Sequence, residues 1–180
     1  MLITCSAIAQ SFLLLVTGPM LGISGGTQAI LSYNYGARKT ARVKKTERSI
    51  LLLMLCFTSF MFLVSRIVPQ FFVGLFTSNP DYYDFSAWAI QTYTLMIIPL
   101  SFQYVFVDGL TALERPKTAL CLSIFRKGLY VAATLVLPVL FTAQSAFFAE
   151  SLADGVSAVL STCIFLLIIN KHLLRREHSF

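Results

Sequence analysis

Residues 18–48 read GPMLGISGGTQAILSYNYGARKTARVKKTER, an apolar run without charge that changes abruptly into a cluster of cations. Gly18, Gly22 and Gly26 recur at intervals of four, which places them in one stripe on an α-helix. The cations that follow are Arg38, Lys39, Arg42, Lys44, Lys45 and Arg48. Lys and Arg residues beside an apolar segment are typical of the cytoplasmic side of a transmembrane helix. The stretch therefore predicts a helix that leaves the bilayer on the cytoplasmic side.

The composition of the 180 residues also indicates a membrane protein. The mean hydropathy is +0.76, and 57% of the residues are hydrophobic while only 12% are charged. In soluble proteins roughly a quarter of the residues are charged. The net charge of +6 does not indicate nucleic-acid binding, because the cations occupy short loops and form no recognition motif. We therefore expect the lipid bilayer as a partner and no nucleic acid.

Five segments are long enough to cross a bilayer, which requires about 20 apolar residues at 1.5 Å each. None shows the sustained alternation of a strand, and an open sheet would leave backbone groups unpaired in lipid. Four prolines, Pro19, Pro69, Pro99 and Pro138, predict kinks in or near the ends of four segments. The expected fold is an all-α, polytopic membrane bundle. Its spans are predicted at residues 2–35, 49–72, 85–113, 119–141 and 146–170.

Charge in the loops alternates from one side of the predicted bundle to the other. Of the fourteen Lys and Arg residues, only Arg66 is expected on the side opposite the rest. Arg126 and Lys127 are expected just inside the helix that follows the third loop. Because cations collect in cytoplasmic loops, the pattern predicts a multi-pass protein of the plasma (inner) membrane with a cytoplasmic C-terminus.

The sequence lacks the usual patterns of catalytic and metal sites. It contains no G-x-S-x-G, H-E-x-x-H or P-loop motif, so we expect no enzymatic activity. His172 and His178 lie in a basic tail, and the cysteines are far apart in apolar segments, which favours packing over metal binding. The cysteines are Cys5, Cys56, Cys121 and Cys163.

The sequence opens directly on an apolar run, from Met1 to Val16, without a cationic leader. This is not the pattern of a signal peptide. Either a bare N-terminus is translocated or the sequence is the C-terminal part of a longer protein, and we favour the second interpretation.

Three motifs resemble the multidrug and toxic compound extrusion (MATE) family of transporters. Residues 22–45, GISGGTQAILSYNYGARKTARVKK, are similar to the glycine-rich helix end and Tyr-Asn-Tyr-Gly-Ala turn of the family's second half. Residues 110–127, LTALERPKTALCLSIFRK, resemble the cytoplasmic loop three crossings later, and residues 147–162, FFAESLADGVSAVLST, resemble the start of the last helix. The resemblance implies that residues 1–180 form most of a C-terminal lobe, helices eight to twelve of twelve.

The resemblance also implies a function. A MATE-type protein is a cation-coupled antiporter, driven by H⁺ or Na⁺, that exports amphipathic, often cationic, drugs by alternating access between two lobes. An N-terminal lobe or a partner chain is then required, and no further cofactor is expected. The alternative, from another class, is a helical membrane subunit or adaptor without transport activity that binds a partner through the Gly18–Gly26 face. The sequence departs from the family pattern at Glu114, where glycine is usual, and at Ser151, where proline often opens the last helix.

Four residues are candidates for substrate or cation binding. Asp108 and Asp154 are carboxylates at membrane depth, where a charge is costly and suggests function. Each is also explained by a structural role, as an interfacial acid or, for Asp154, a charge near the positive end of a helix. Gln103 and Tyr93 lie on the third span, where with Met96 they could contact a flat cationic drug, although bonding between helices explains Gln103 as well.

The opening stretch contains the remaining candidates, for packing and hinge motion. The stripe of Gly18, Gly22 and Gly26 favours close helix packing, with a substrate route as the alternative. The turn after it suits a hinge in which Gly36 caps the helix and the cations stabilise its negative end. The turn residues are Tyr33, Asn34, Tyr35 and Gly36.

Overall fold

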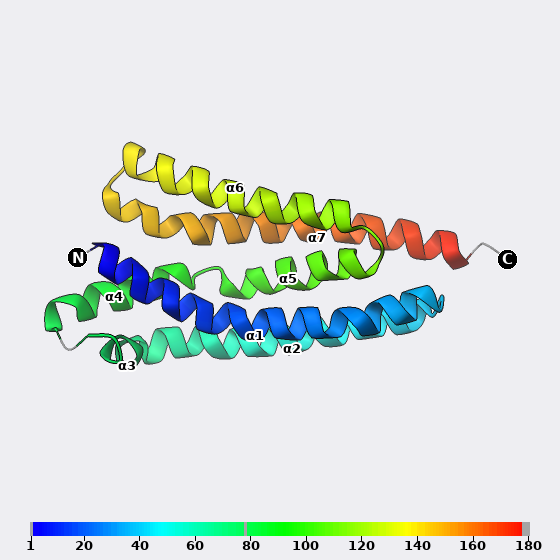
Figure 1. The fold of residues 1–180 in the computed structure, drawn as a ribbon, viewed down its shortest axis with the longest axis horizontal. Helices are drawn as coiled ribbons and strands as arrows, with labels where there is room; N and C mark the ends of the chain where they lie inside the picture. Colours follow the sequence, from blue (N-terminus) through cyan, green and yellow to red (C-terminus); the bar gives the residue numbers. More distant parts are fainter. Residues whose placement is uncertain (1, 78, 178–180) are drawn as a thin grey trace.

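The computed structural model describes residues 2–77 and 79–177, and these residues form helices with no strand among them. The expected all-α membrane bundle is confirmed. The elements are α1 (Leu2–Gly36), α2 (Thr40–Ile67), α3 (Pro69–Gly74), α4 (Pro80–Tyr93), α5 (Ile97–Ala112), α6 (Pro116–Leu140), a 3₁₀ turn η1 (Ala143–Phe147) and α7 (Phe148–Glu177). The long helices run along one common axis, with α1 and α2 on one side, α6 and α7 on the other and α5 between the two pairs (Figure 1).

Four segments of the described chain are each long and apolar enough to cross a bilayer: α1, α2, α6 and Ala143–Ile169. A fifth crossing is obtained when α4 and α5, which meet at 42°, are counted as one broken span. The segment predicted at 85–113 is therefore a broken span, with the bend near the predicted kink at Pro99. The break comes before Pro99, which has no N–H to donate to the carbonyl of Leu95.

The second span also differs from its prediction, because α2 begins at Thr40 and not near residue 49. Its buried residues include Val43, Glu47, Ile50 and Met54, which follow helical spacing through the cationic segment. The cations of this segment lie on the exposed side of α2, so they do not interrupt the helix. The helix ends at Ile67 and α3 begins at Pro69, so the segment predicted to reach residue 72 is interrupted at the proline for which a kink was predicted.

The turns after α1 and α5 have the same geometry. Arg38 and Glu114 each adopt a left-handed conformation, with φ of 56° and 61°. The amide of the next residue donates back to the helix in both, from Lys39 to Asn34 and from Arg115 to Leu110. Both turns are therefore Schellman caps. The predicted cap at Gly36 is wrong, because Gly36 remains helical and Arg38 takes the left-handed position.

Hydroxyl groups connect α2 to α5 and to the break between α4 and α5. The Thr58 and Ser101 hydroxyls are 2.8 Å apart, and Thr94 Oγ1 donates to Ser65 Oγ at 3.0 Å. Ser151 of α7 donates to the carbonyl of Thr92, next to the break. These buried contacts hold the break in place between helices, since hydrogen bonds between spans stabilise membrane bundles.

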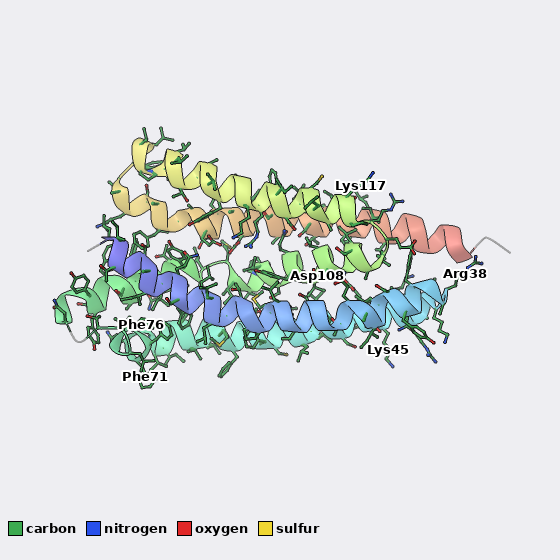
Figure 2. All side chains as sticks on the ribbon, in the orientation of Figure 1. Arg38, Lys45, Phe71, Phe76, Asp108 and Lys117 are labelled. Carbon is green, nitrogen blue, oxygen red and sulfur yellow. The ribbon has the colours of Figure 1, made fainter. Side chains whose placement is uncertain are left out.

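The two ends of the bundle differ in character. Arg38, Lys45 and Lys117 lie at one end, here called the basic end, while Phe71 and Phe76 lie at the other (Figure 2). Between the ends, α6 exposes large apolar side chains such as Leu135 and Val139. An apolar belt with cations at one end suits a bilayer-spanning protein.

Candidate functional site

A cavity of about 220 Å³ lies between α1, α5 and α6. Its walls combine charged, polar and apolar side chains: Leu21, Gln103, Tyr104, Val107, Asp108, Ser123, Arg126 and Lys127. The residues from α5 share one face of that helix because of their spacing: Gln103, Tyr104, Val107 and Asp108. Two of the four predicted binding residues, Gln103 and Asp108, thus line one cavity.

The centre of the charged wall is an ion pair between α6 and α7. Arg126 Nη1 donates to Asp154 Oδ1 at 2.6 Å and lies 3.9 Å from Glu150 Oε1. The Asp154 side chain is only 1% exposed and the Arg126 side chain 12% exposed. Asp154 Oδ2 is buried and has no hydrogen-bond partner among the described residues. The short charge-assisted bond orients the guanidinium group at the cavity wall.

Tyr104 completes the surroundings of Arg126. The guanidinium carbon lies 5.6 Å from the centre of the Tyr104 ring, within the range of a cation–π contact. Tyr104 and Arg126 both line the cavity, whereas Asp154 and Glu150 lie behind Arg126 on α7. Arg126 therefore links the acids of α7 to the cavity wall.

The depth of Arg126 corrects the sequence prediction. Arg126 lies about three turns into α6, roughly 15 Å from the start of the helix at 1.5 Å per residue. It was expected just inside the helix, as part of the cytoplasmic charge. A cation at this depth is tolerated because it is paired with acids, which offsets part of the cost of burying both charges. Asp154 is accordingly an ion-pair partner rather than a helix cap.

Gln103 and Asp108 offer hydrogen-bond acceptors to the same cavity. Gln103 is buried, and its Oε1 atom has no hydrogen-bond partner among the described residues. Asp108 is half-buried at the cavity wall. The predicted bonding of Gln103 between helices is therefore incomplete in this structure. The cavity presents acceptors on α5 opposite the cations Arg126 and Lys127 on α6.

Tyr93 is separated from the other predicted binding residues. It lines a second cavity of about 430 Å³, near the start of α1, together with Gln10 and Tyr130. Its ring packs edge-on against Phe147 with centroids 5.7 Å apart. Met96 instead packs against α7, within 3.6 Å of the position that a Cβ on Gly155 would occupy. The structure does not bring Tyr93, Met96 and Gln103 together.

The glycine stripe on α1 is exposed. No atom lies within 4 Å of the position that a Cβ would occupy on Gly18, Gly22 or Gly26, apart from the local helix backbone and adjacent residues. The predicted packing is therefore not made within the described helices and stays a prediction for a partner. In the turn that follows, Tyr33 is exposed, whereas Asn34 and Tyr35 are buried.

Three charged residues were missed as site candidates: Arg126, Glu150 and Glu47. Arg126 is predicted with the cytoplasmic cations, and no sequence pattern marks Glu150 as its partner. Glu47 was assigned to a loop, although it keeps helical spacing with Val43 and Ile50. That spacing was the available signal for a buried acid.

The bundle and its charged cavity define a polytopic helical membrane protein with ionisable side chains between its spans. The family model MatE matches residues 3–137, which is most of the chain. The chain therefore belongs to the MatE family, as the resemblance in the sequence indicated.

Solved structures show the same fold. A crystal structure of MATE in complex with MaL6 superposes with a TM-score of 0.88 at 14% identity, covering 96% of this chain and 40% of that chain. The outward-facing conformation of a multidrug resistance MATE family transporter of the MOP superfamily gives a TM-score of 0.86 at 16% identity, covering 96% and 39%. The chain thus spans about two fifths of the length of these proteins. No curated protein matches the chain at a significant level.

Proposed function

We propose that these helices form part of a MATE-type transporter that exports amphipathic, cationic drugs and other xenobiotics in exchange for H⁺ or Na⁺. The observation that carries the proposal is the buried Arg126–Asp154 pair at the wall of the α1–α5–α6 cavity. Ionisable groups at membrane depth, facing a cavity between helices, mark substrate and ion pathways. Membership of the MatE family supports a transport role over catalysis.

The proposed coupling uses the two sides of Arg126. With Asp154 charged, Arg126 is held toward α7 and the cation adds positive charge to the cavity wall. When Asp154 is neutralised by a proton, the attraction weakens and the guanidinium can turn from α7 toward the cavity. The affinity of Asp108 and Gln103 for a cationic substrate would then depend on the position of the Arg126 guanidinium group. Substrate binding and proton binding are therefore linked.

We propose that the basic end faces the cytoplasm of the plasma (inner) membrane. Arg38, Lys45 and Lys117 lie at this end, and the described part of α7 also ends there (Figure 2). A cytoplasmic location of these loops agrees with the distribution of cations around transmembrane segments. The C-terminus is then cytoplasmic.

Alternating access requires a complementary set of helices in addition to these. MATE structures of the same fold are about two and a half times as long, and transporters of this kind bind substrate between repeats. The alternative is an adaptor without transport activity. The exposed Gly18–Gly26 stripe favours it, since such a stripe allows close approach of another helix.

The test is efflux of a fluorescent cationic dye from cells that express the chain together with a matching first lobe. We expect lower dye accumulation with both lobes and none of this effect with either lobe alone. Arg126→Met and Asp154→Asn should abolish efflux, whereas the exposed Lys117→Gln should leave it unchanged. Full efflux by Arg126→Met would refute the assigned site, and copurification of the lobes without efflux would favour the adaptor.

A further inference from the structure

We propose that Glu47 and Asp108 form a proton-binding site between α2 and α5, separate from the Arg126–Asp154 pair, in which Glu47 holds the proton and Asp108 connects it to the cavity. The inference deepens the proposed cation-coupled function, but it stands on the geometry of two carboxyl groups and their surroundings. It also assigns a role to the acid that the sequence patterns left in a loop.

Glu47 lies on the buried face of α2 and is 7% exposed. It follows Val43 and precedes Ile50 in the buried stripe, while Lys44, Lys45 and Arg48 are exposed. Helical spacing therefore turns these nearby cations of the same helix away from the bundle interior. The acid enters the interior without them.

Gly109 of α5 provides the space that the Glu47 carboxyl group occupies. A Cβ on Gly109 would lie 2.6 Å from Glu47 Oε1 and 3.0 Å from the Phe165 ring. The carboxyl group thus packs close to the backbone of α5, and a side chain at position 109 would require the carboxyl group or the Phe165 ring to move. Phe165, stacked on Phe106 with centroids 4.5 Å apart, forms an apolar wall at the same place.

No cation neutralises Glu47 among the side chains that the structure describes. Glu47 Oε1 is buried without a hydrogen-bond partner among the described residues, and no described cation forms a salt bridge with Glu47. An ionised carboxylate without a partner in such a place is strongly unfavourable, and a bound proton removes most of that cost. The site therefore suits a neutral, protonated carboxyl group.

A proton fits better than a metal ion. Hard cations such as Mg²⁺ and Ca²⁺ take about six or more oxygen ligands, and no group of three or more His, Cys, Asp or Glu residues suited to a metal occurs in the described ranges. At Gly109, the Glu47 carboxyl group lies beside the α5 backbone and the Phe165 ring. Such surroundings supply few ligand atoms.

Asp108 connects this site to the cavity. It precedes Gly109 on α5, interacts electrostatically with Glu47 and lines the α1–α5–α6 cavity. Figure 2 shows Asp108 in the layer between α5 and α1. Because two neighbouring carboxylates repel each other, the pair accommodates one proton more easily than two negative charges. Half-buried Asp108 can exchange that proton with water in the cavity.

The test uses dicyclohexylcarbodiimide, which attacks protonated carboxyl groups in apolar surroundings, on the full chain in lipid nanodiscs. Peptide mass spectrometry should find the adduct on Glu47 and not on Glu114, an exposed acid on the loop after α5 that serves as the matched control. Glu47→Gln should remove the adduct, and Asp108→Asn should change its yield severalfold. Suppression of labelling by Na⁺ at constant ionic strength would overturn the proton assignment in favour of a metal ion.

A second measurement covers the case in which the reagent cannot reach Glu47. The infrared spectrum of the same sample should show a carbonyl band of a protonated carboxyl group that is lost in Glu47→Gln. Absence of both the adduct and the band would refute the inference. Neither readout requires transport, so this failure would leave the proposed function intact. Labelled Glu47 in a two-lobe protein without dye efflux would refute the proposed function alone.

Discussion

Asp154 and Glu47 are both buried acids, yet the bundle accommodates them in opposite ways. Asp154 is bonded to Arg126 at 2.6 Å, with Glu150 as a second acid nearby. Glu47 faces a glycine backbone and an aromatic ring and has no described cation. The difference teaches that burial alone does not define the state of an acid in a membrane bundle. What decides it is whether a facing helix supplies a cation or only backbone and apolar surface.

The largest expected change in the free energy of unfolding comes from removing the cation of the Arg126–Asp154 pair. Arg126→Met leaves Asp154 and Glu150 buried without their cation, and should lower the free energy of unfolding by about 3–5 kcal/mol. Denaturation in mild detergent measures it. The neighbouring exposed residue serves as control, because Lys127→Met should change stability by no more than about 0.5 kcal/mol. A loss below about 1 kcal/mol for Arg126→Met would contradict the pairing.

A matched pair of amide substitutions compares the two acids directly. Asp154→Asn removes a charge-assisted bond and should cost about 2 kcal/mol. Glu47→Gln replaces a neutral group by a neutral group and should change stability by less than about 1 kcal/mol. The same denaturation measurement decides between them. Equal losses for both variants would mean that Glu47 is charged and paired, against the comparison.

The substitution Gly109→Ala tests the packing of the Glu47 carboxyl group against α5. The new methyl group would lie 2.6 Å from Glu47 Oε1 and should cost about 1–3 kcal/mol through overpacking. Glu47→Ala in the same chain should recover part of this loss, which a double-mutant cycle measures. Gly155→Ala is the control, because its methyl group would meet only flexible Met96 at 3.5 Å. Additive losses would show that Glu47 does not pack on Gly109.

The smallest expected effect is the coupling energy of a hydrogen bond between uncharged side chains at the same α2–α5 interface. The Thr58 and Ser101 hydroxyls share a buried hydrogen bond of 2.8 Å. A cycle of Thr58→Val and Ser101→Ala should give a coupling of about 0.6 kcal/mol, the average for hydrogen bonds between membrane helices. A coupling as large as that of Arg126 with Asp154 would remove the distinction between neutral and charged contacts in this bundle.

Several parts of the candidate site were predictable because they depend on local chemistry. Asp108, Asp154 and Gln103 stand out as polar groups in apolar segments, and two of them line the cavity. Glu114 occupies a position where the family pattern has glycine, and it adopts the left-handed conformation that favours glycine. Glu47 was missed because charge density was taken to end the helix, although the cations lie on one face and the acid on the other.

Sequence alone determined the helical class, the apolar character of the long segments and the family. These follow from composition, from apolar length and from motifs that are contiguous in the chain. Tertiary structure alone decided that Arg126 meets Asp154, that Glu47 rests on Gly109, and that Tyr93 and Gln103 line different cavities. The physical reason is that periodicity assigns each residue to a face of its own helix, whereas the facing partner depends on how separate helices pack and where the broken span bends.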